Sequence, residues 1–153
     1  MKTWIKVILA IVLAGIVIQF IPVDTENKPV KPEEDFVVIY NTPQDVQALM
    51  KKACYDCHTN ETKYPKYATF APVSWSIKNH VNQGRKYVNW SIWGTYNKDL
   101  QRGMLKNTIN SMEHKTMPIN GYMVYHPEAR LTDAEYARLR NYFQEILDKE
   151  TAK

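Results

Sequence analysis

Apolar residues recur every three or four positions through much of the second half of the chain, as on a helix that buries one face. Two segments show the pattern clearly, residues 98–112 and the stretch that follows Thr132. The apolar stripe of the first is Leu100, Met104, Leu105, Ile109 and Met112, and that of the second is Tyr136, Leu139, Phe143, Ile146 and Leu147. Thr132 and Glu135 form a capping-box pattern where the second begins. The sequence therefore predicts two long amphipathic helices.

Two more helices are expected nearer the N-terminus. Thr42 followed by Pro43 is a favourable helix start, with the threonine as N-cap, and apolar residues at helical spacing continue to residue 53. Another helix is predicted from about residue 72 to 83, ending near Gly84. Strand signals are weak, since only residues 36–40 look extended. The predicted fold class is all-α.

The N-terminal segment has a different pattern. After Lys2 and Lys6, the chain is uncharged and almost entirely apolar to residue 21. Counted from Trp4, the segment that ends there is just long enough to span a bilayer. No small-x-small cleavage site ends it, so we predict an uncleaved signal-anchor or transmembrane segment over residues 1–21 rather than a removed signal peptide. Basic residues precede the span and acidic residues follow it. This bias predicts a single pass through a bacterial inner membrane, with the C-terminal domain in the periplasm.

Residues 22–35 are predicted to form a tether. Pro22, Pro29 and Pro32 lie among charged residues there, which favours a stiff, extended segment. At about 3 Å per residue, such a segment could hold the domain a few tens of ångströms from the bilayer. Residues 36–153 then have the length of one domain, without an internal repeat.

The only two cysteines of the chain lie in the sequence Cys54-Tyr55-Asp56-Cys57-His58. The Cys-x-x-Cys-His pattern is the attachment signal of a c-type haem, in which both thiols add to the vinyl groups and the histidine becomes an axial iron ligand. Two intervening residues bring both sulfur atoms to one side of a single helical turn. We therefore predict one covalently bound haem c, with Cys54 and Cys57 as thioether anchors and His58 as the proximal ligand.

Three other interpretations of the box compete with haem attachment. A thioredoxin-type redox pair would be expected at a strand-to-helix junction of a βαβ unit, which the flanking sequence does not support. A tetrahedral zinc site needs four protein ligands, and only one histidine is nearby. A structural disulfide would leave His58 without a role.

The distal ligand is predicted to be Met117. It follows a helix, and Pro118 opens the loop in which it lies, so its thioether can project towards an iron without breaking a helix. The main rival is His80, in the middle of a predicted helix. Methionines on an apolar stripe are more often core residues than ligands. The remaining candidates are Met104, Met112, Met123, His114 and His126.

Short motifs beyond the box resemble the bacterial haem-binding domain family of small c-type cytochrome-like proteins. They are Tyr64-Pro65, Ala71-Pro72-Val73-Ser74-Trp75, His80-Val81, Gly84-Arg85, Asn89-Trp90-Ser91, Trp93-Gly94, Met117-Pro118, Tyr122, His126-Pro127 and Leu131-Thr132. The resemblance covers nearly everything from the first helix of the domain to the last. It implies a cytochrome-c-like helical fold, exported and membrane-associated, with haem c. By analogy with class I cytochromes, it also implies that the Met117 element supplies the distal ligand.

These observations predict a membrane-anchored, periplasmic monohaem c-type cytochrome that transfers electrons, rather than an enzyme. The expected partners are redox proteins, such as a respiratory complex or a peroxidase. Nucleic acid is not expected, because the 20 basic and 16 acidic residues include no dense Lys/Arg run. One alternative is a haem-based sensor or peroxidase-like protein with an open distal site. The sequence shows no separate acid–base constellation for peroxide cleavage, although His80 with Arg85 could in principle act as one. Another alternative is a purely structural haem domain docked on a larger respiratory complex.

Overall fold

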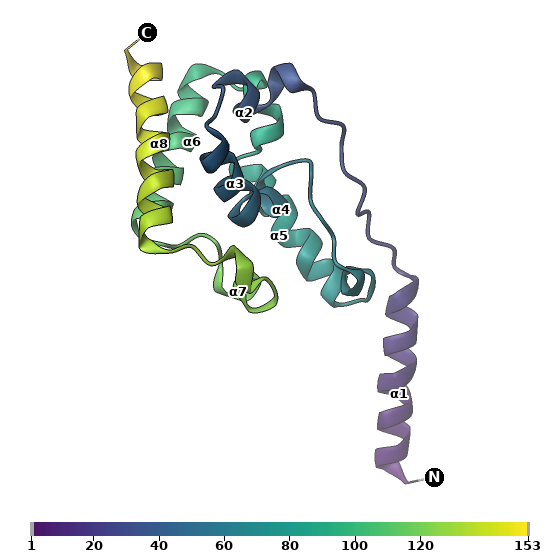
Figure 1. The fold of residues 1–153 in the computed structure, drawn as a ribbon. Coiled ribbons are helices and arrows are strands. Elements are labelled where there is room, and N and C mark those ends of the chain that lie inside the picture. Colours follow the sequence, from purple (N-terminus) through teal and green to yellow (C-terminus); the bar gives the residue numbers. More distant parts are fainter. Residues whose placement is uncertain (1, 153) are drawn as a thin grey trace.

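The computed structural model describes residues 2–152, and these residues form an all-helical structure without strands (Figure 1). The α-helices are α1 (Thr3–Val17), α2 (Phe36–Ile39), α3 (Gln44–Ala53), α4 (Tyr55–His58), α5 (Val73–Tyr87), α6 (Lys98–Glu113), α7 (Asn120–Tyr125) and α8 (Asp133–Thr151). Short 3-10 turns connect them: η1 (Ile18–Phe20), η2 (Pro32–Glu34), η3 (Lys66–Thr69), η4 (Trp90–Thr95) and η5 (Pro127–Ala129). The predicted fold class is confirmed.

Helices α6 and α8 pack side by side and run in opposite directions (Figure 1). Lys98, at the start of α6, bonds Glu150 near the end of α8, with 2.6 Å between Nζ and Oε2. The predicted capping box is present at the start of α8. The Thr132 hydroxyl accepts a hydrogen bond from the Glu135 backbone N–H, and the Glu135 carboxylate accepts one from the Thr132 N–H. Both long C-terminal helices thus lie where the apolar stripes predicted them.

A cluster of large rings fills one side of the domain, and we call it the aromatic core. Its members are fully buried and come from α2, η4 and α8: Phe36, Trp90, Trp93 and Phe143. The ring centroids of Phe36 and Trp90 are 4.8 Å apart, and the Trp90 and Phe143 rings are stacked at 5.4 Å. Such rings bury a large apolar area each, so they dominate the stability of a small domain.

Three local predictions were wrong. Residues 36–40 include helix α2 instead of an extended segment, because the Asp35 carboxylate caps the turn by accepting a hydrogen bond from the Val37 N–H. Thr42 is not the N-cap of α3, since its hydroxyl pairs with the Tyr142 hydroxyl at 2.7 Å. Helix α5 does not end near Gly84 but continues to Tyr87.

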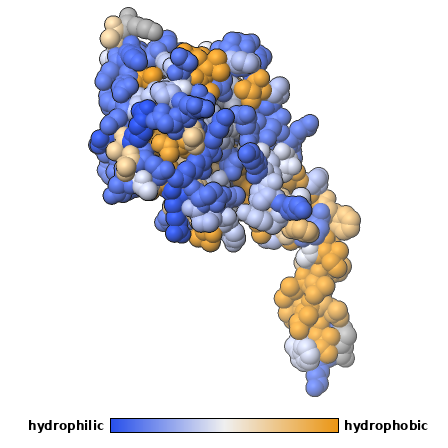
Figure 2. Space-filling view, in the orientation of Figure 1, coloured by the Kyte–Doolittle hydropathy of each residue, from blue (hydrophilic) through white to orange (hydrophobic). Residues whose placement is uncertain are grey.

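The N-terminal segment projects away from the domain, as Figures 1 and 2 show. Residues Thr3–Phe20 form one helical stretch with a mean hydropathy of 2.2, long and apolar enough to cross a membrane and with none of its residues buried. The chain then runs back along the domain in an extended conformation. Asn27 fastens this part by donating to the Thr62 carbonyl and accepting from the Arg85 guanidinium. Part of the predicted tether therefore lies against the domain.

Candidate functional site

The Cys-x-x-Cys-His box occupies the single-turn helix α4, directly after α3. The backbone N–H groups of Cys57 and His58 both donate to the carbonyl of Cys54, at 3.2 and 2.9 Å. The hydroxyls of Thr59 and Thr62, just after the box, donate back to carbonyls within it at 2.7 Å. The box is thus a closed turn that holds its two thiols and its imidazole on a defined backbone.

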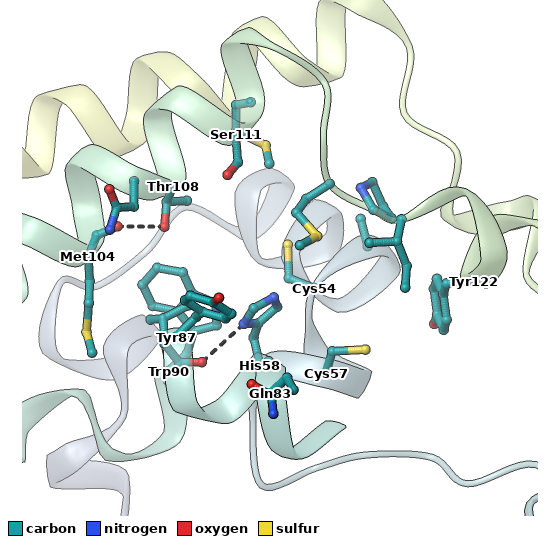
Figure 3. Close-up of a pocket in the computed structure, with 18 of the residues that line it drawn as sticks. Cys54, Cys57, His58, Gln83, Tyr87, Trp90, Met104, Thr108, Ser111 and Tyr122 are labelled. Carbon is teal, nitrogen blue, oxygen red and sulfur yellow. Dashed lines mark hydrogen bonds between the residues drawn. The ribbon is translucent and has the colours of Figure 1, made fainter. Parts of the chain in front are cut away.

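The His58 ring is oriented by the carbonyl of Val88. Its Nδ1 lies 3.1 Å from that oxygen (Figure 3). Because a carbonyl only accepts, Nδ1 carries the proton and Nε2 keeps a free lone pair. Burial lowers the pKa of His58, which favours the neutral imidazole. A histidine whose outer nitrogen donates to a carbonyl is the usual arrangement of a metal-binding imidazole.

The two thiols are free and half-buried. Burial raises the pKa of Cys54 to about 12 and that of Cys57 to about 11. Redox-active Cys-x-x-Cys pairs have the opposite shift, because a positive neighbourhood stabilises their thiolate. The box also lies in an all-helical chain, and no three His, Cys, Asp or Glu side chains within residues 2–152 are grouped to hold a metal ion by themselves. Neither a thioredoxin-type pair nor a four-ligand zinc site fits this arrangement.

A cavity of about 590 Å³ lies between the box, α5, α6 and the loop that follows α6 (Figure 3). This volume is in the range of about 300–1,000 Å³ that is usual for sites of small molecules and cofactors. Cys54, Cys57 and His58 all line it. So do four of the side chains considered as distal ligands, namely His80, Met104, Met112 and Met117, whereas Met123, His114 and His126 are not among its lining residues.

The polar groups of the cavity suit a large apolar ring with acidic substituents. The Trp90 ring lines the cavity, and its indole N–H is buried without a hydrogen-bond partner, as are the Tyr64 hydroxyl and the Trp75 indole N–H, whose residues do not line the cavity. Neutral donors on α5 and α6 also line the cavity, namely Gln83, Asn107, Thr108, Asn110 and Ser111. Thiols, an oriented imidazole and methionine sulfur around one cavity together fit haem.

These polar residues of α6 were missed at the level of sequence. They continue the face that carries Met104, at positions 107, 108 and 111. In an isolated amphipathic helix such amides and hydroxyls look like part of the solvent-exposed face. These side chains line the cavity only because α6 packs opposite the box.

Gly84 allows α5 to touch the box. A Cβ at this position would lie 3.0 Å from both the carbonyl carbon and the Cβ of Cys57, and closer still to the Cys57 carbonyl oxygen. Any side chain at position 84 would therefore push α5 away from α4. This contact explains why the glycine lies inside a helix that it was predicted to end.

Tyr122, on α7, joins the box to the segment that follows Met117. Its hydroxyl donates to the Asp56 carboxylate at 2.7 Å, and its ring lines the cavity and stacks on His126 with 4.3 Å between centroids. Burial, followed by the hydrogen bond to Asp56, raises the pKa of Tyr122. The tyrosine remains a neutral donor that ties the two sides of the cavity together.

Arg85 does not line the cavity, although the sequence made it a candidate partner of His80. Its guanidinium donates to the Thr59 carbonyl at 2.7 Å and to the Thr62 hydroxyl at 2.9 Å. It also holds Asn27 of the N-terminal segment. An acid–base pair of His80 and Arg85 within the cavity is therefore wrong, since the arginine braces the loop after the box instead.

Comparison with known proteins gives one assignment. The model of a haem-binding domain family matches residues 13–145, from the second half of α1 to most of α8. No curated protein matches the chain, and no solved structure matches it.

Proposed function

Because this chain belongs to the haem-binding domain family, we propose that it is a monohaem c-type cytochrome that transfers electrons in the periplasm. In this proposal Cys54 and Cys57 bind the haem covalently, His58 is the proximal ligand and Met117 is the distal ligand. When bound, the haem supplies an iron that exchanges one electron between its ferrous and ferric states. The chain's own residues hold, orient and shield it.

The observation that carries the proposal is the hydrogen bond from His58 Nδ1 to the Val88 carbonyl, beside two thiols at one cavity wall. This bond leaves Nε2 as the coordinating atom and fixes the plane of the ring. A ligand that cannot turn or change its tautomer keeps its geometry when the charge of the iron changes. The largely apolar walls would surround the haem with a medium of low polarity, which is one of the factors that set its reduction potential.

Met117 is favoured over His80 by its surroundings. Both side chains line the cavity, but Met117 is half-buried beside the buried Pro118, whereas His80 is exposed on α5. An exposed imidazole is satisfied by water and gains less from binding in the cavity than a sheltered thioether does. A thioether ligand also favours ferrous iron and raises the reduction potential, which suits an electron carrier.

Absorption spectra of the full chain, matured by a cytochrome c assembly system, test the ligands. We expect low-spin spectra in both oxidation states, a weak near-infrared sulfur-to-iron band in the ferric form, and poor binding of carbon monoxide. Met117→Ala should remove this band, lower the potential and admit carbon monoxide. Met104→Ala is the matched control and should retain the band.

Two results would contradict the ligand assignment. A spectrum that changes with His80→Ala but not with Met117→Ala would indicate bis-histidine ligation. A high-spin spectrum of the wild-type protein, together with ready binding of carbon monoxide, would favour the sensor or peroxidase-like alternative.

A separate measurement tests the covalent attachment. Haem that leaves the denatured chain on acid extraction would disprove it.

We further propose that α1 is a signal anchor in the inner membrane, with the domain in the periplasm and redox proteins as partners. The apolar, unburied stretch Thr3–Phe20 supports this, as do Lys2 just before it and Lys6 in its first turn. Protease added to intact spheroplasts should cut the chain between residues 22 and 35. Protection of this segment, or a mature chain that lacks α1, would contradict the topology.

A further inference from the structure

Large apolar side chains gather on the end of the domain nearest to α1. They lie on η3 and directly after it, on the start of α5 and on α7, and we call them the apolar face: Tyr67, Phe70, Val73, Val124 and Tyr125. Phe70 is 64% exposed and Tyr125 is 71% exposed. The rings of Tyr67 and Tyr125 meet with 5.7 Å between centroids, so the parts from η3 and α7 form one surface. A contiguous exposed patch of this kind marks an interaction site.

This surface is continuous with the end of the apolar helix. The Gln19 side chain, at the end of the stretch Thr3–Phe20, bonds both backbone groups of Ala71. Its amide N–H donates to the Ala71 carbonyl at 3.0 Å, and its amide oxygen accepts from the Ala71 N–H at 3.0 Å. Phe70 is the neighbouring residue. The apolar face therefore begins where the membrane helix ends, and Figure 1 shows η3 and α7 at the same level as that end.

We propose that the apolar face is a second membrane contact, seated in the interface of the periplasmic leaflet. The proposal rests on the proposed function in one respect, namely that α1 spans the bilayer. A helix that crosses the membrane up to Phe20 places Phe70 at the boundary between lipid tails and headgroups, because Gln19 holds the two segments together. Tyrosine rings are enriched at this boundary, since their apolar body and polar hydroxyl suit its two sides.

Lipid is the occupant that the geometry favours over a protein. A partner protein or a second copy would have to approach a surface that already adjoins the bilayer. The interface accepts apolar groups to a depth of about 5–10 Å, which suits side chains carried by short turns and a one- to two-turn helix. Contact of this face with the membrane would hold the domain against the bilayer in one orientation. Without it, α1 and residues 22–35 alone would connect the domain to the membrane.

Photocrosslinking in the full chain tests the proposal. Benzoylphenylalanine replaces Phe70 in haem-loaded protein reconstituted in nanodiscs of phosphatidylethanolamine and phosphatidylglycerol, and adducts are identified by mass spectrometry. The same probe at Val38 of α2, which is 55% exposed, is the matched control for an exposed apolar position outside the apolar face. A probe at Leu13 reports on the anchor itself. An unchanged haem spectrum verifies that each variant folds.

We expect lipid adducts at Leu13 and Phe70 and far fewer at Val38. Lipid adducts at Leu13 with none at Phe70, or protein adducts at Phe70, would overturn the second contact and leave the anchor intact. Equal lipid labelling at Phe70 and Val38 would overturn it as well, since the contact would then lack specificity. The absence of lipid adducts at Leu13 would instead overturn the anchor and, with it, the inference drawn from it.

Discussion

The interior of the domain is filled in different ways on its two sides. On one side, the aromatic core consists of fully buried rings in direct contact. On the other, α5, α6 and the box surround a cavity of about 590 Å³ lined by sulfur atoms and small polar groups. Trp90 belongs to both, because its ring stacks on Phe143 and also lines the cavity. The protein completes the first side by itself, and we infer that haem completes the second.

The strongest test of this contrast removes the covalent link. Cys54→Ser combined with Cys57→Ser should abolish haem staining of the denatured chain completely, because no other cysteine exists. The aromatic core contains neither thiol, so the variant should retain helical circular dichroism, although with reduced thermal stability. Haem staining that survives the double substitution would show that the box is not the attachment site.

A substitution in the aromatic core should have the opposite pattern. Trp93 is fully buried, and Trp93→Ala should lower the free energy of unfolding by about 3–5 kcal/mol. Urea denaturation of the haem-loaded protein measures this loss. The spectrum of the folded fraction should remain that of the wild type, since Trp93 does not line the cavity. A changed axial spectrum would mean that the two sides are more tightly coupled than their packing indicates.

A substitution at the contact between α5 and the box should have a smaller effect on stability. Gly84→Ala inserts a Cβ against Cys57, and overpacking of this kind costs about 1–3 kcal/mol. We also expect a lower yield of haem-loaded protein. Gly103→Ala is the matched control within α6, where a Cβ would meet no atom within 4 Å, and it should stabilise the helix by about 0.5–1 kcal/mol. Equal effects of the two substitutions would remove the special role of the contact.

The smallest effect concerns alkaline pH. Burial raises the pKa of Tyr40 to about 12, and its hydroxyl donates to Glu150 and accepts from Trp93. The unfolded tyrosine ionises near pH 10. The stabilisation from the neutral phenol is therefore complete below about pH 10 and is lost as the pH rises towards 12. Tyr40→Phe should reduce this alkaline slope and cost about 0.5–1.5 kcal/mol at neutral pH.

Tyr122→Phe is the counterpart on the cavity side. It removes the hydrogen bond to Asp56, so it should alter the haem spectrum or the potential, whereas Tyr40→Phe should leave both unchanged. Chemical denaturation between pH 7 and 12, with the spectrum recorded at each step, distinguishes the two. Identical responses would contradict the separation of the two sides.

The helices of the C-terminal half could be predicted because their signals are local. A capping box and an apolar stripe at the helical period are sufficient for α8, and α6 follows from its stripe. The segment 36–40 could not, because its β-branched residues favour a strand and only the Asp35 cap turns it into α2. The end of α5 was predicted wrongly for a related reason. Gly84 is needed for the contact with Cys57, which lies 27 positions earlier in the sequence.

The candidate site divides in the same way. Family membership and helical class could be predicted from motifs that lie within the sequence itself, and the structure adds the Val88 carbonyl, the free Trp90 N–H and the α6 wall. None of these three has a sequence signature, because each depends on which segment packs opposite the box. The ligand roles of His58 and Met117 remain predictions for the spectra to decide.

The bond between Tyr122 and Asp56 has a consequence for the order of events during maturation. It fastens α7, and the loop that carries Met117, across a box whose thiols are half-buried. If haem is attached to these thiols as proposed, a chain that formed this contact early would hide them from the enzymes that deliver haem. We therefore expect haem to be delivered before α7 packs against the box. The Tyr122–Asp56 contact would then be the last tertiary contact to form, and it would close the cavity around the attached haem.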